Sequence, residues 1–378
     1  MSGRTTMRVT VIGGGVAGAA SAIALRRIGA EVTVHEAYED PAGQVGSFLS
    51  LAVNGLRALD ALQCGDAVRE AGFEVADLAM VSSAGRTLGV VPRGRLSSEG
   101  MRSVTVARGR LVEVLRAEAE RSGARIVTGH RLGSPAEADP DADLVVGADG
   151  IWSATRTALD PAAPVPAYAG LYSASGVSPD IGLPSATFHM VFARAGAFLY
   201  VPTPDGKVWW SAQVASPRPP DLGAVSLSSL AGLFRHEPGP AALLAAATEL
   251  HRPTLMHKLP EVPVRHDART VLIGDAAHPV GAGQGASMAI EDALALARCV
   301  AVAPSVAAGL AAYDAERRPR IARMLRAAAD NRDAKTPGPL RRRINDALLP
   351  WALRYGYERS MAWLYTHDPG TLPTPAAR

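Results

Sequence analysis

The sequence predicts an α/β protein in which a lobe built on a parallel sheet joins a second lobe built on an antiparallel sheet. Three observations support this. A strand, glycine loop, helix and strand open the chain, and a second strand, loop and helix follow at Val271–Ala297. Short strands of alternating pattern fill the region between Tyr168 and Pro263. The 378 residues, 48% of them hydrophobic, suffice for two cores.

The composition argues against several classes of protein. A net charge of +3 and scattered arginines do not favour nucleic acid as a partner. Cys64 and Cys299 have neither a CxxC spacing nor a histidine-rich neighbourhood, so we expect no metal site and a reducing compartment. The N-terminus enters a strand without a signal peptide, and no apolar run is long enough to span a bilayer. We therefore expect a cytoplasmic protein without a membrane partner.

The first element is a βαβ unit, "RVTVIGGGVAGAASAIALRRIGAEVTVHE". A buried apolar strand is predicted at Val9–Ile12 and a helix at Ala17–Ile28, where apolar residues recur at helical spacing. A second short strand is predicted at Glu31–Val34.

A glycine fingerprint joins the first strand of this unit to its helix. Gly13, Gly15 and Gly18 form the pattern GxGxxG, and Glu36 follows the second strand at the distance of a ribose-binding acid. This context favours a Rossmann-like nucleotide site over a tight turn without a ligand. Since the acid is Glu rather than Arg or Lys, it indicates a free 2′-hydroxyl group, as in FAD or NAD.

Three further segments continue the first lobe. "AGQVGSFLSLAVNGLRALDAL" reads as a glycine-bearing loop, a strand and an amphipathic helix. "SVTVARGRLVEVLRAEAERSGARIV" is a strand entering a helix, with Arg108 either facing a phosphate or marking a helix start. A buried strand at Leu144–Gly147 ends in Asp149-Gly150, which by itself is most simply a turn.

The late unit, "VLIGDAAHPVGAGQGASMAIEDALALA", places an acid and three glycines where a strand meets a helix. The first N–H groups of a helix lack internal partners and are electropositive, so they attract an acceptor or an anion. Gly281, Gly283 and Gly285 leave the backbone open to a ligand, and Asp275 can accept hydrogen bonds from ligand hydroxyl groups. A capped turn is the alternative. We interpret His278 as a residue that shapes the loop.

These motifs occur in a fixed order: the glycine fingerprint, "GADGIWSATR", and "GDAAHP…GQGAS…EDA". Together they resemble the class A flavoprotein monooxygenases, the family of p-hydroxybenzoate and salicylate hydroxylases. The resemblance covers roughly the first 330 residues and is weak or absent between Tyr168 and Pro263. It implies a p-hydroxybenzoate hydroxylase-like fold, FAD as cofactor and NADH or NADPH as transient reductant. A flavin C4a-hydroperoxide would hydroxylate or epoxidise an aromatic or polycyclic small molecule.

The resemblance also implies the residues that contact FAD. The three glycines would approach the pyrophosphate, Glu36 the adenosine ribose, Leu132 the adenine edge and Asp275 the ribityl hydroxyl groups. The full set is Gly13, Gly15, Val16, Ala17, Gly18, Glu36, Gly46, Ser47, Arg108, Leu132, Asp149, Gly150, Gly274, Asp275, Gly283, Gln284, Gly285 and Ala286. The segment "HPVGAGQG" is shorter than the family pattern, which often includes a proline beside the reacting oxygen. Pro279 is a candidate substrate residue together with Phe198, Tyr200 and Trp209 of the second lobe.

The second lobe contains "GAFLYVPTP" and "KVWWSAQVA", two strands joined by the turn "TPDG". Pairing outward from a two-residue turn sets Tyr200 across from Trp209 and Leu199 across from Trp210. One face would then be wholly apolar. The other, with Phe198, Tyr200, Lys207, Trp209 and Ser211, would face the ligand or, alternatively, solvent.

The domain boundaries follow from these patterns. We expect the FAD-binding domain in 1–72, 96–167 and 264–335, the substrate-binding domain in 73–95 and 168–263, and a C-terminal helical segment in 336–378. Two amphipathic helical stretches, broken at Pro350, should pack on the flavin lobe. Membrane association through Arg341–Arg343 is the alternative.

The sequence thus predicts an FAD-dependent monooxygenase acting with NAD(P)H and O2. The alternatives are a non-catalytic, reductase-type or halogenase-type flavoprotein that binds a similar ligand. The sequence has no second GxGxxG, so a separate flavin reductase as partner stays open.

Overall fold

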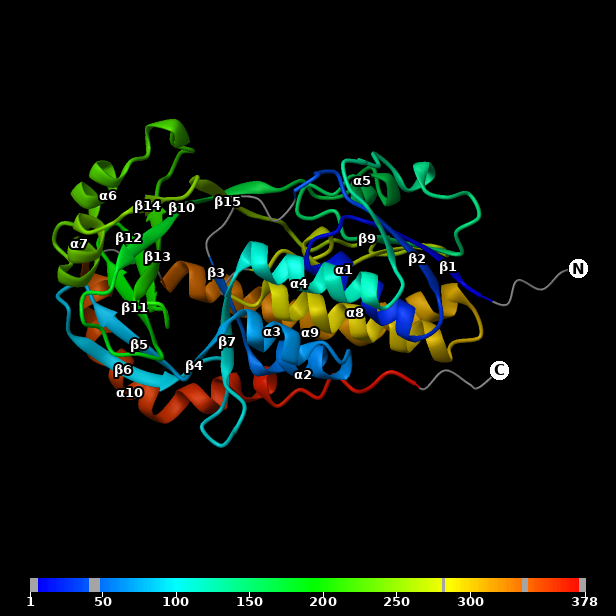
Figure 1. Cartoon of the computed structure of the whole chain (residues 1–378). Helices are drawn as coiled ribbons and strands as arrows, with labels where there is room; N and C mark the ends of the chain where they lie inside the picture. Colours follow the sequence, from blue (N-terminus) through cyan, green and yellow to red (C-terminus); the bar gives the residue numbers. More distant parts are fainter. Residues whose placement is uncertain (1–5, 41–47, 281–282, 335–338, 374–378) are drawn as a thin grey trace, which may run out of the picture.

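The structure is a computed structural model that describes residues 6–40, 48–280, 283–334 and 339–373. Its two lobes lie side by side (Figure 1). A parallel sheet with its helices forms the lobe on the right of the view, and a larger sheet forms the lobe on the left. The predicted combination of lobes is confirmed.

A five-stranded parallel sheet organises the first lobe. Its order is β16-β9-β1-β2-β8, and every neighbouring pair is parallel. The strands are β1 (Arg8–Ile12), β2 (Glu31–His35), β8 (Arg125–Val127), β9 (Leu144–Gly147) and β16 (Thr270–Leu272). The order brings the carboxyl ends of β1, β9 and β16 together at one edge.

Helices cover one face of this parallel sheet. Alternate residues of β1 and β2, including Val9, Val11 and Val34, are buried against them. The helices of this layer are α1 (Val16–Arg27), α4 (Arg108–Arg121) and α8 (Gly285–Val302). The predicted βαβ unit is confirmed, because β1, α1 and β2 follow one another and β1 pairs with β2 in parallel.

A small sheet and four helices complete this side of the molecule. The sheet has the order β3-β7-β4. The elements are β3 (Phe48–Leu51), β4 (Phe73–Val75), β7 (Ser103–Ala107), α2 (Val53–Ala61), α3 (Gly65–Ala71), α5 (Ala154–Leu159) and α9 (Val306–Ala334), with short 3-10 turns η1 (Pro135–Glu137) and η3 (Gly274–Ala276).

An eight-stranded sheet forms the second lobe. Its path is β14-β10-β13-β12-β11-β5-β6, with β15 also paired to β10. The strands are β5 (Asp77–Ser82), β6 (Thr87–Pro92), β10 (Ala167–Pro179), β11 (Thr187–Ala193), β12 (Gly196–Pro202), β13 (Lys207–Ala215), β14 (Glu249–Leu250) and β15 (Thr254–Lys258). One pair, β5 with β11, is parallel, so the sheet is mixed rather than purely antiparallel as predicted.

Two helices close the outer face of the eight-stranded sheet. They are α6 (Leu227–Phe234) and α7 (Pro238–Ala245), with η2 (Leu222–Ala224) before them. Leu230, Phe234 and Leu243 from these helices share a buried cluster with Trp210 of β13. Figure 1 shows α6 and α7 on the outer side of the sheet, away from the parallel-sheet lobe. The opposite face of the sheet is therefore the one directed toward the first lobe.

The predicted register of the hairpin between β12 and β13 is wrong by one residue. Gly206 adopts φ 75° and is an extra residue in the turn, while the Thr203 N–H donates to the Lys207 carbonyl at 2.8 Å. Tyr200 consequently pairs with Trp210, and Val201 pairs with Trp209. A shift of one residue exchanges the faces of a strand.

The face assignment of Phe198 and Tyr200 is corrected as a result. Both share the face of Trp210 under α6 and α7, and they are 0% and 6% exposed. They are core residues and do not share a face with Trp209. Trp209 and Ser211 lie on the opposite, half-buried face, as predicted.

The last helix, α10 (Pro339–Tyr365), continues through Pro350, contrary to the predicted break. Proline has no N–H group, so the carbonyl four residues earlier loses its helical partner. That carbonyl belongs to Asp346, and the Arg86 guanidinium donates to it at 2.8 Å. Figure 1 shows α10 running along one edge of both lobes. In the described part of the chain, every helix is too short or too polar to cross a membrane.

Candidate functional site

The glycine loop after β1 has two closely packed glycines and one open glycine. A Cβ atom on Gly13 would lie 2.4 Å from the Ala148 carbonyl oxygen, and one on Gly18 would lie 1.8 Å from the Gly13 oxygen. A Cβ on Gly15, by contrast, would have no heavy atom within 4 Å. Gly13 and Gly18 are thus required by packing, whereas the space beside Gly15 is free for a ligand.

Glu36 lies against this loop and is 7% exposed. Its carboxylate accepts hydrogen bonds from the N–H groups of Gly14 at 2.8 Å and Tyr38 at 3.1 Å. Arg116 lies 3.2 Å from the same carboxylate and donates to the Gly14 carbonyl at 2.7 Å. Burial lowers the pKa of Arg116, and the Glu36 charge opposes that shift. Arg116 is not predictable from the sequence, since helical spacing alone does not reveal its pairing with Glu36.

Asp275 and Arg108 approach the same region from two other elements. Asp275 follows β16, and Arg108 is the first residue of α4. Burial raises the pKa of Asp275, and His278 and Arg108 oppose the shift. The Asp275 side chain nevertheless reaches solvent, and its Oδ1 would lie 3.7 Å from a Cβ on Gly285. A carboxylate deep among protein atoms yet open to solvent can accept hydrogen bonds from a ligand.

Asp149 stabilises the turn in which it lies by accepting hydrogen bonds from Ser153 and Thr155. Ser153 Oγ donates to one carboxylate oxygen at 2.5 Å, and the Thr155 N–H and hydroxyl group donate to the other at 3.0 Å. The buried Arg156 then donates to the carbonyls of Ile151 and Ala276 at 2.8 and 3.0 Å. Asp149-Gly150 therefore acts as a rigid turn that is tied to the loop after β16.

A buried ionic network supports the loop between β16 and α8. Asp292 Oδ2 accepts from the Gly274 N–H at 3.0 Å and lies 2.5 Å from His278 Nε2. Its other oxygen accepts from Arg317 Nε at 2.8 Å. Despite full burial, His278 and Arg317 keep the pKa of Asp292 well below its usual range. The contact with Asp292 agrees with the prediction that His278 shapes the loop.

The neighbouring acid, Glu291, extends this network toward α2 and α9. It accepts from Arg317 at 2.7 Å, from Arg320 at 2.7 and 2.8 Å, and from Asn54 at 2.7 Å. Arg317 and Arg320 keep the pKa of Glu291 at about 2 although burial opposes this. Glu291 and Asp292 belong to the "EDA" motif, for which the sequence predicts no role. Two adjacent acids on an otherwise apolar helix were the signal that could have revealed this network.

The start of α8 completes the site. Gln284 is the N-cap residue, Gly285 and Ala286 form the first turn, and Gly283 has φ 75° with free space where a Cβ would stand. Pro279 is half-buried, and the adjacent Val280 packs in a cluster with Tyr365 of α10. Three residues predicted for this site, Gly46, Ser47 and Gly281, lie outside the described residues.

Leu132 lies farther along the same lobe. It is 8% exposed and packs with Ile12, Ala138 and Val145. Ile12 is the last residue of β1 and Val145 lies in the neighbouring strand β9, so Leu132 covers the sheet beside the glycine loop. Its predicted contact with adenine stays a prediction.

Aromatic rings line the face of the eight-stranded sheet that is directed toward the first lobe. Trp209 stacks on Phe48 with ring centroids 5.8 Å apart and meets the edge of Phe73 at 5.6 Å. Phe48 pairs with Ala107, the residue before Arg108. This aromatic face therefore borders the region of Arg108 and Asp275.

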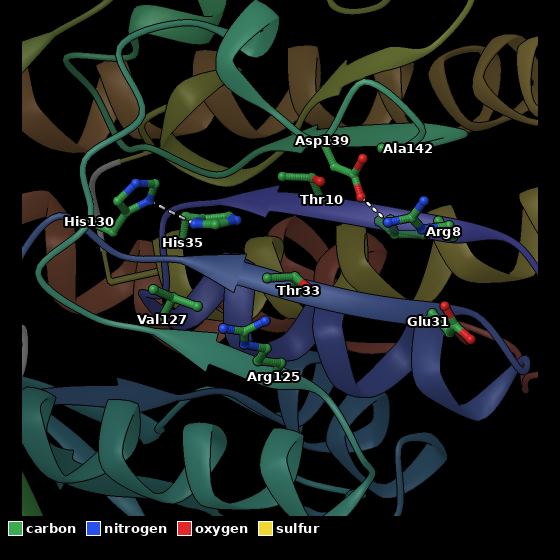
Figure 2. A pocket seen from close by; sticks show the side chains of 11 residues that line it. Arg8, Thr10, Glu31, Thr33, His35, Arg125, Val127, His130, Asp139 and Ala142 are labelled. Carbon is green, nitrogen blue, oxygen red and sulfur yellow. Dashed lines mark hydrogen bonds and ion pairs between the residues drawn. The ribbon is translucent and has the colours of Figure 1, made fainter.

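A separate cavity of about 440 Å³ lies against β1, β2 and β8 (Figure 2). His35 and His130 meet there with their Nδ1 atoms 2.9 Å apart, and Arg8 pairs with Asp139. Burial lowers the pKa of His35, and His130 and Arg125 add to the shift. The glycine loop, Asp275 and Trp209 do not line this cavity, so it is distinct from the predicted site.

Comparisons with known proteins indicate a flavin-binding protein. A family model described as an FAD binding domain matches residues 6–328. The aurachin C monooxygenase/isomerase of Stigmatella aurantiaca is 31% identical over 344 residues, which cover 83% of this chain and 86% of that protein. The kynurenine 3-monooxygenase of Salinispora arenicola is 29% identical over 361 residues, covering 84% of this chain and 77% of the relative.

Solved structures share the fold. HpxO of Klebsiella pneumoniae, complexed with FAD and uric acid, has a TM-score of 0.81 at 22% identity. The alignment covers 95% of this chain and 96% of that one. The arrangement of both lobes is thus common to the two proteins.

Proposed function

The chain belongs to the class A FAD-dependent aromatic monooxygenases, and from this premise we propose that it hydroxylates or epoxidises an aromatic or polycyclic small molecule. It is an FAD-dependent monooxygenase whose reductant is NADH or NADPH. One atom of O2 enters the substrate, and the other leaves as water while NAD(P)H is oxidised. FAD, when bound, supplies the chemistry that activates oxygen.

Features of the described residues fit FAD. The space beside Gly15 suits a pyrophosphate at the N-terminus of α1, where the helix favours negative charge. Glu36 suits a ribose hydroxyl group, and the accessible carboxylate of Asp275 suits the ribityl hydroxyl groups. Arg108 supplies a positive charge near Asp275. We assign these residues to the cofactor on that basis.

The N-terminus of α8 has a further role in this proposal. Gln284, Gly285 and Ala286 present backbone N–H groups that have no partner within the helix. Donors preorganised toward developing charge commonly contribute about 3 kcal/mol each. We assign them to the electron-rich edge of the reduced flavin. The network of Asp292 and Arg317 keeps this helix and the preceding loop in fixed positions.

The observation that carries the substrate class is the aromatic face around Trp209. Trp209 and Phe48 are half-buried and stacked, and Phe48 lies beside the strand residue that precedes Arg108. An aromatic compound held there would therefore lie between the two lobes. Aromatic pairs contribute about 0.5–1.5 kcal/mol beyond buried area. The relatives named for aurachin C and kynurenine support a ring substrate. Pro279, which is half-buried on the loop toward α8, is also assigned to the substrate.

In this proposal, one lobe binds FAD and the other binds the substrate. The FAD-binding domain would comprise 1–72, 96–167 and 264–335, and the substrate-binding domain 73–95 and 168–263. The segment 336–378 would be a C-terminal helical segment. In support, 77–92 and 167–258 contribute strands to one sheet. The unpaired Cys64 and Cys299 are compatible with a cytoplasmic location.

The proposal is tested with the purified protein alone. NAD(P)H consumption is measured under air with a panel of phenols, indoles and polycycles, and products are identified by mass. Stimulation by one compound, with formation of its oxygenated product, supports the proposal. If a bound FAD is reduced only when a flavin reductase is added, the reductant is delivered by a partner. Bound FAD without any product would identify a ligand-binding flavoprotein instead.

A further inference from the structure

An apolar stripe runs along the exposed side of α10. Its members are spaced four, three and four residues apart, which places them on one face of a helix. They are Ile344, Leu348, Trp351 and Tyr355, with exposed fractions of 48%, 61%, 68% and 60%. The rings of Trp351 and Tyr355 lie 5.7 Å apart between centroids. Single exposed apolar residues are ordinary, but a patch of this kind commonly marks a binding surface.

The opposite side of α10 packs on the substrate lobe. Leu353 lies so close to Gly89 of β6 that a Cβ on Gly89 would come within 2.7 Å of it. The Tyr357 hydroxyl group donates to the carbonyl of Pro92, the last residue of β6, at 3.2 Å. Leu353 and Tyr357 lie about half a turn around the helix from the stripe. The stripe is therefore directed away from the eight-stranded sheet.

The charge of α10 complements an anionic surface. The helix contains five arginines and two acids, so its net charge is +3. Arg354 and Arg359 are exposed, and Arg354 Cζ lies 5.3 Å from the centroid of the Tyr355 ring. A positive charge thus borders the apolar stripe. The remaining charged residues of the helix are Arg341, Arg342, Arg343, Asp346 and Glu358.

This combination is typical of a helix that lies on a lipid surface. Such helices bury an apolar face at the boundary between headgroups and acyl chains and present basic residues to anionic headgroups. Tryptophan and tyrosine favour the same depth, because their rings are apolar and carry one polar group. Among the described residues, no helix is long and apolar enough to cross a bilayer, so the fitting arrangement is a helix parallel to the surface.

A second copy of this chain fits the stripe less well. Stable interfaces bury about 800 Å² on each partner, which is more than four partly exposed side chains provide. Pairing α10 with its copy would also bring together two helices that each carry an excess of positive charge, which is unfavourable. An anionic lipid surface has neither disadvantage.

We infer that α10 binds the surface of an anionic membrane through Ile344, Leu348, Trp351 and Tyr355. This departs from the expectation of no membrane partner, which rested on the lack of an apolar run long enough to span a bilayer. The exposed stripe becomes apparent only when the other side of α10 is seen to pack on β6. One consequence rests on the proposed function: the substrate lobe would lie beside the phase in which polycyclic compounds dissolve.

The test measures sedimentation of the FAD-loaded full-length protein with lipid vesicles, without substrate or NAD(P)H. One set of vesicles contains equal amounts of phosphatidylcholine and phosphatidylglycerol, and the other contains phosphatidylcholine alone. We expect binding to the anionic vesicles, and roughly tenfold or weaker binding to the neutral ones. Each basic residue near an anionic surface contributes about fivefold. High salt should weaken the binding, because it screens the charges.

A double variant tests the apolar stripe. Leu348→Ser combined with Trp351→Ser should weaken binding to the anionic vesicles roughly tenfold or more. FAD content and melting temperature should stay unchanged, because both side chains are exposed. The matched control combines Val165→Ser with Val302→Ser, two residues outside α10 that are 76% and 71% exposed. The control should bind like the wild type.

A second double variant tests the charge. Arg354→Gln combined with Arg359→Gln should weaken binding to anionic vesicles roughly tenfold and leave binding to neutral vesicles unchanged. Its control combines Arg102→Gln with Arg110→Gln, which removes two arginines that are 51% and 58% exposed outside α10.

The outcomes are separable from those for the proposed function. Wild-type protein that does not bind the anionic vesicles, or stripe and control variants that bind equally, would overturn the inference. A dimer in ultracentrifugation that the stripe variant dissociates, without vesicle binding, would instead assign the stripe to an interface between copies. Neither result affects the proposed function, which is judged by FAD content and product. Should the stripe variant not fold, Tyr355→Ser and the two vesicle types still decide.

Discussion

The N–H group of Gly274 donates a 3.0 Å hydrogen bond to the carboxylate of Asp292, which lies eighteen residues later on α8. Gly274 immediately precedes Asp275, so this bond fixes the residue assigned to the flavin chain relative to the helix assigned to the flavin ring. Arg317, from α9, neutralises the same carboxylate. Three elements that are distant in sequence thus determine one site.

Asp292→Ala should therefore destabilise the protein and lower its FAD content. Removing one partner of a buried ion pair commonly costs about 3–5 kcal/mol, because the other charge is left unpaired. The free energy of unfolding is measured with urea, and FAD is quantified after denaturation. Asp292→Asn, which keeps the side-chain shape and can still accept from the Gly274 N–H, should cost less. Equal stability of wild type and Asp292→Ala would contradict the role of the network.

Stability should also fall in acid through Glu291. The folded protein keeps the pKa of Glu291 at about 2, below its ordinary 4.5. A lowered pKa means that the stabilisation is present above about pH 4.5 and is lost as the pH falls toward 2. At about 1.4 kcal/mol per pKa unit, the loss is on the order of 3 kcal/mol.

Unfolding by urea between neutral and acidic pH measures this dependence. Glu291→Gln should flatten the curve of unfolding free energy against pH over that window, although it lowers stability at neutral pH. Asp66→Asn is the matched control, because the Asp66 side chain is 96% exposed. An unchanged slope in Glu291→Gln would show that other groups cause the acid sensitivity.

The glycines of the first loop should separate cofactor binding from folding. Gly15→Val places a side chain in free space, so the protein should fold normally and lose FAD. Gly18→Ala forces a Cβ to within 1.8 Å of the Gly13 oxygen and should cost about 1–3 kcal/mol or more. Melting temperature and FAD content are compared in both. Normal FAD content in Gly15→Val would mean that the pyrophosphate lies elsewhere.

The local parts of this fold are predictable from sequence because their causes are local. The glycine spacing, the apolar period of α1 and the acid after β2 lie within thirty residues, and the structure confirms that unit. The hairpin is different, because its register depends on Gly206 adopting a left-handed conformation. Both a two-residue and a three-residue turn fit the sequence "TPDG". The two-residue turn would place Phe198 and Tyr200 on the face of Trp209, whereas the observed turn places both on the face of Trp210.

Ion pairs between residues that are far apart in the sequence were not predictable. Asp292 meets Arg317 twenty-five residues away, and Asn54 reaches Glu291 from α2. No spacing rule links such positions, since the helices must first pack. The continuity of α10 through Pro350 likewise involves Arg86, which lies in the turn between β5 and β6.

Two neighbouring tryptophans test the corrected sheet faces. Trp210 is fully buried under α6 and α7, so Trp210→Ala should cost about 3–5 kcal/mol of stability through a cavity. Trp209 is half-buried on the aromatic face, so Trp209→Ala should raise the substrate dissociation constant about tenfold and spare FAD. Urea unfolding and ligand titration are run on both variants. Reversed effects would mean that the substrate lies on the other face.

The central claim is that this chain transfers oxygen from O2 to an aromatic compound, and isotopic labelling tests it most directly. The purified protein is incubated under labelled O2 with NAD(P)H and the compound that most stimulates its consumption. We expect the product to carry one labelled oxygen atom, with the same product unlabelled when the label is in water. A product that takes its oxygen from water, or NAD(P)H consumption that yields only peroxide with every compound, would contradict this account.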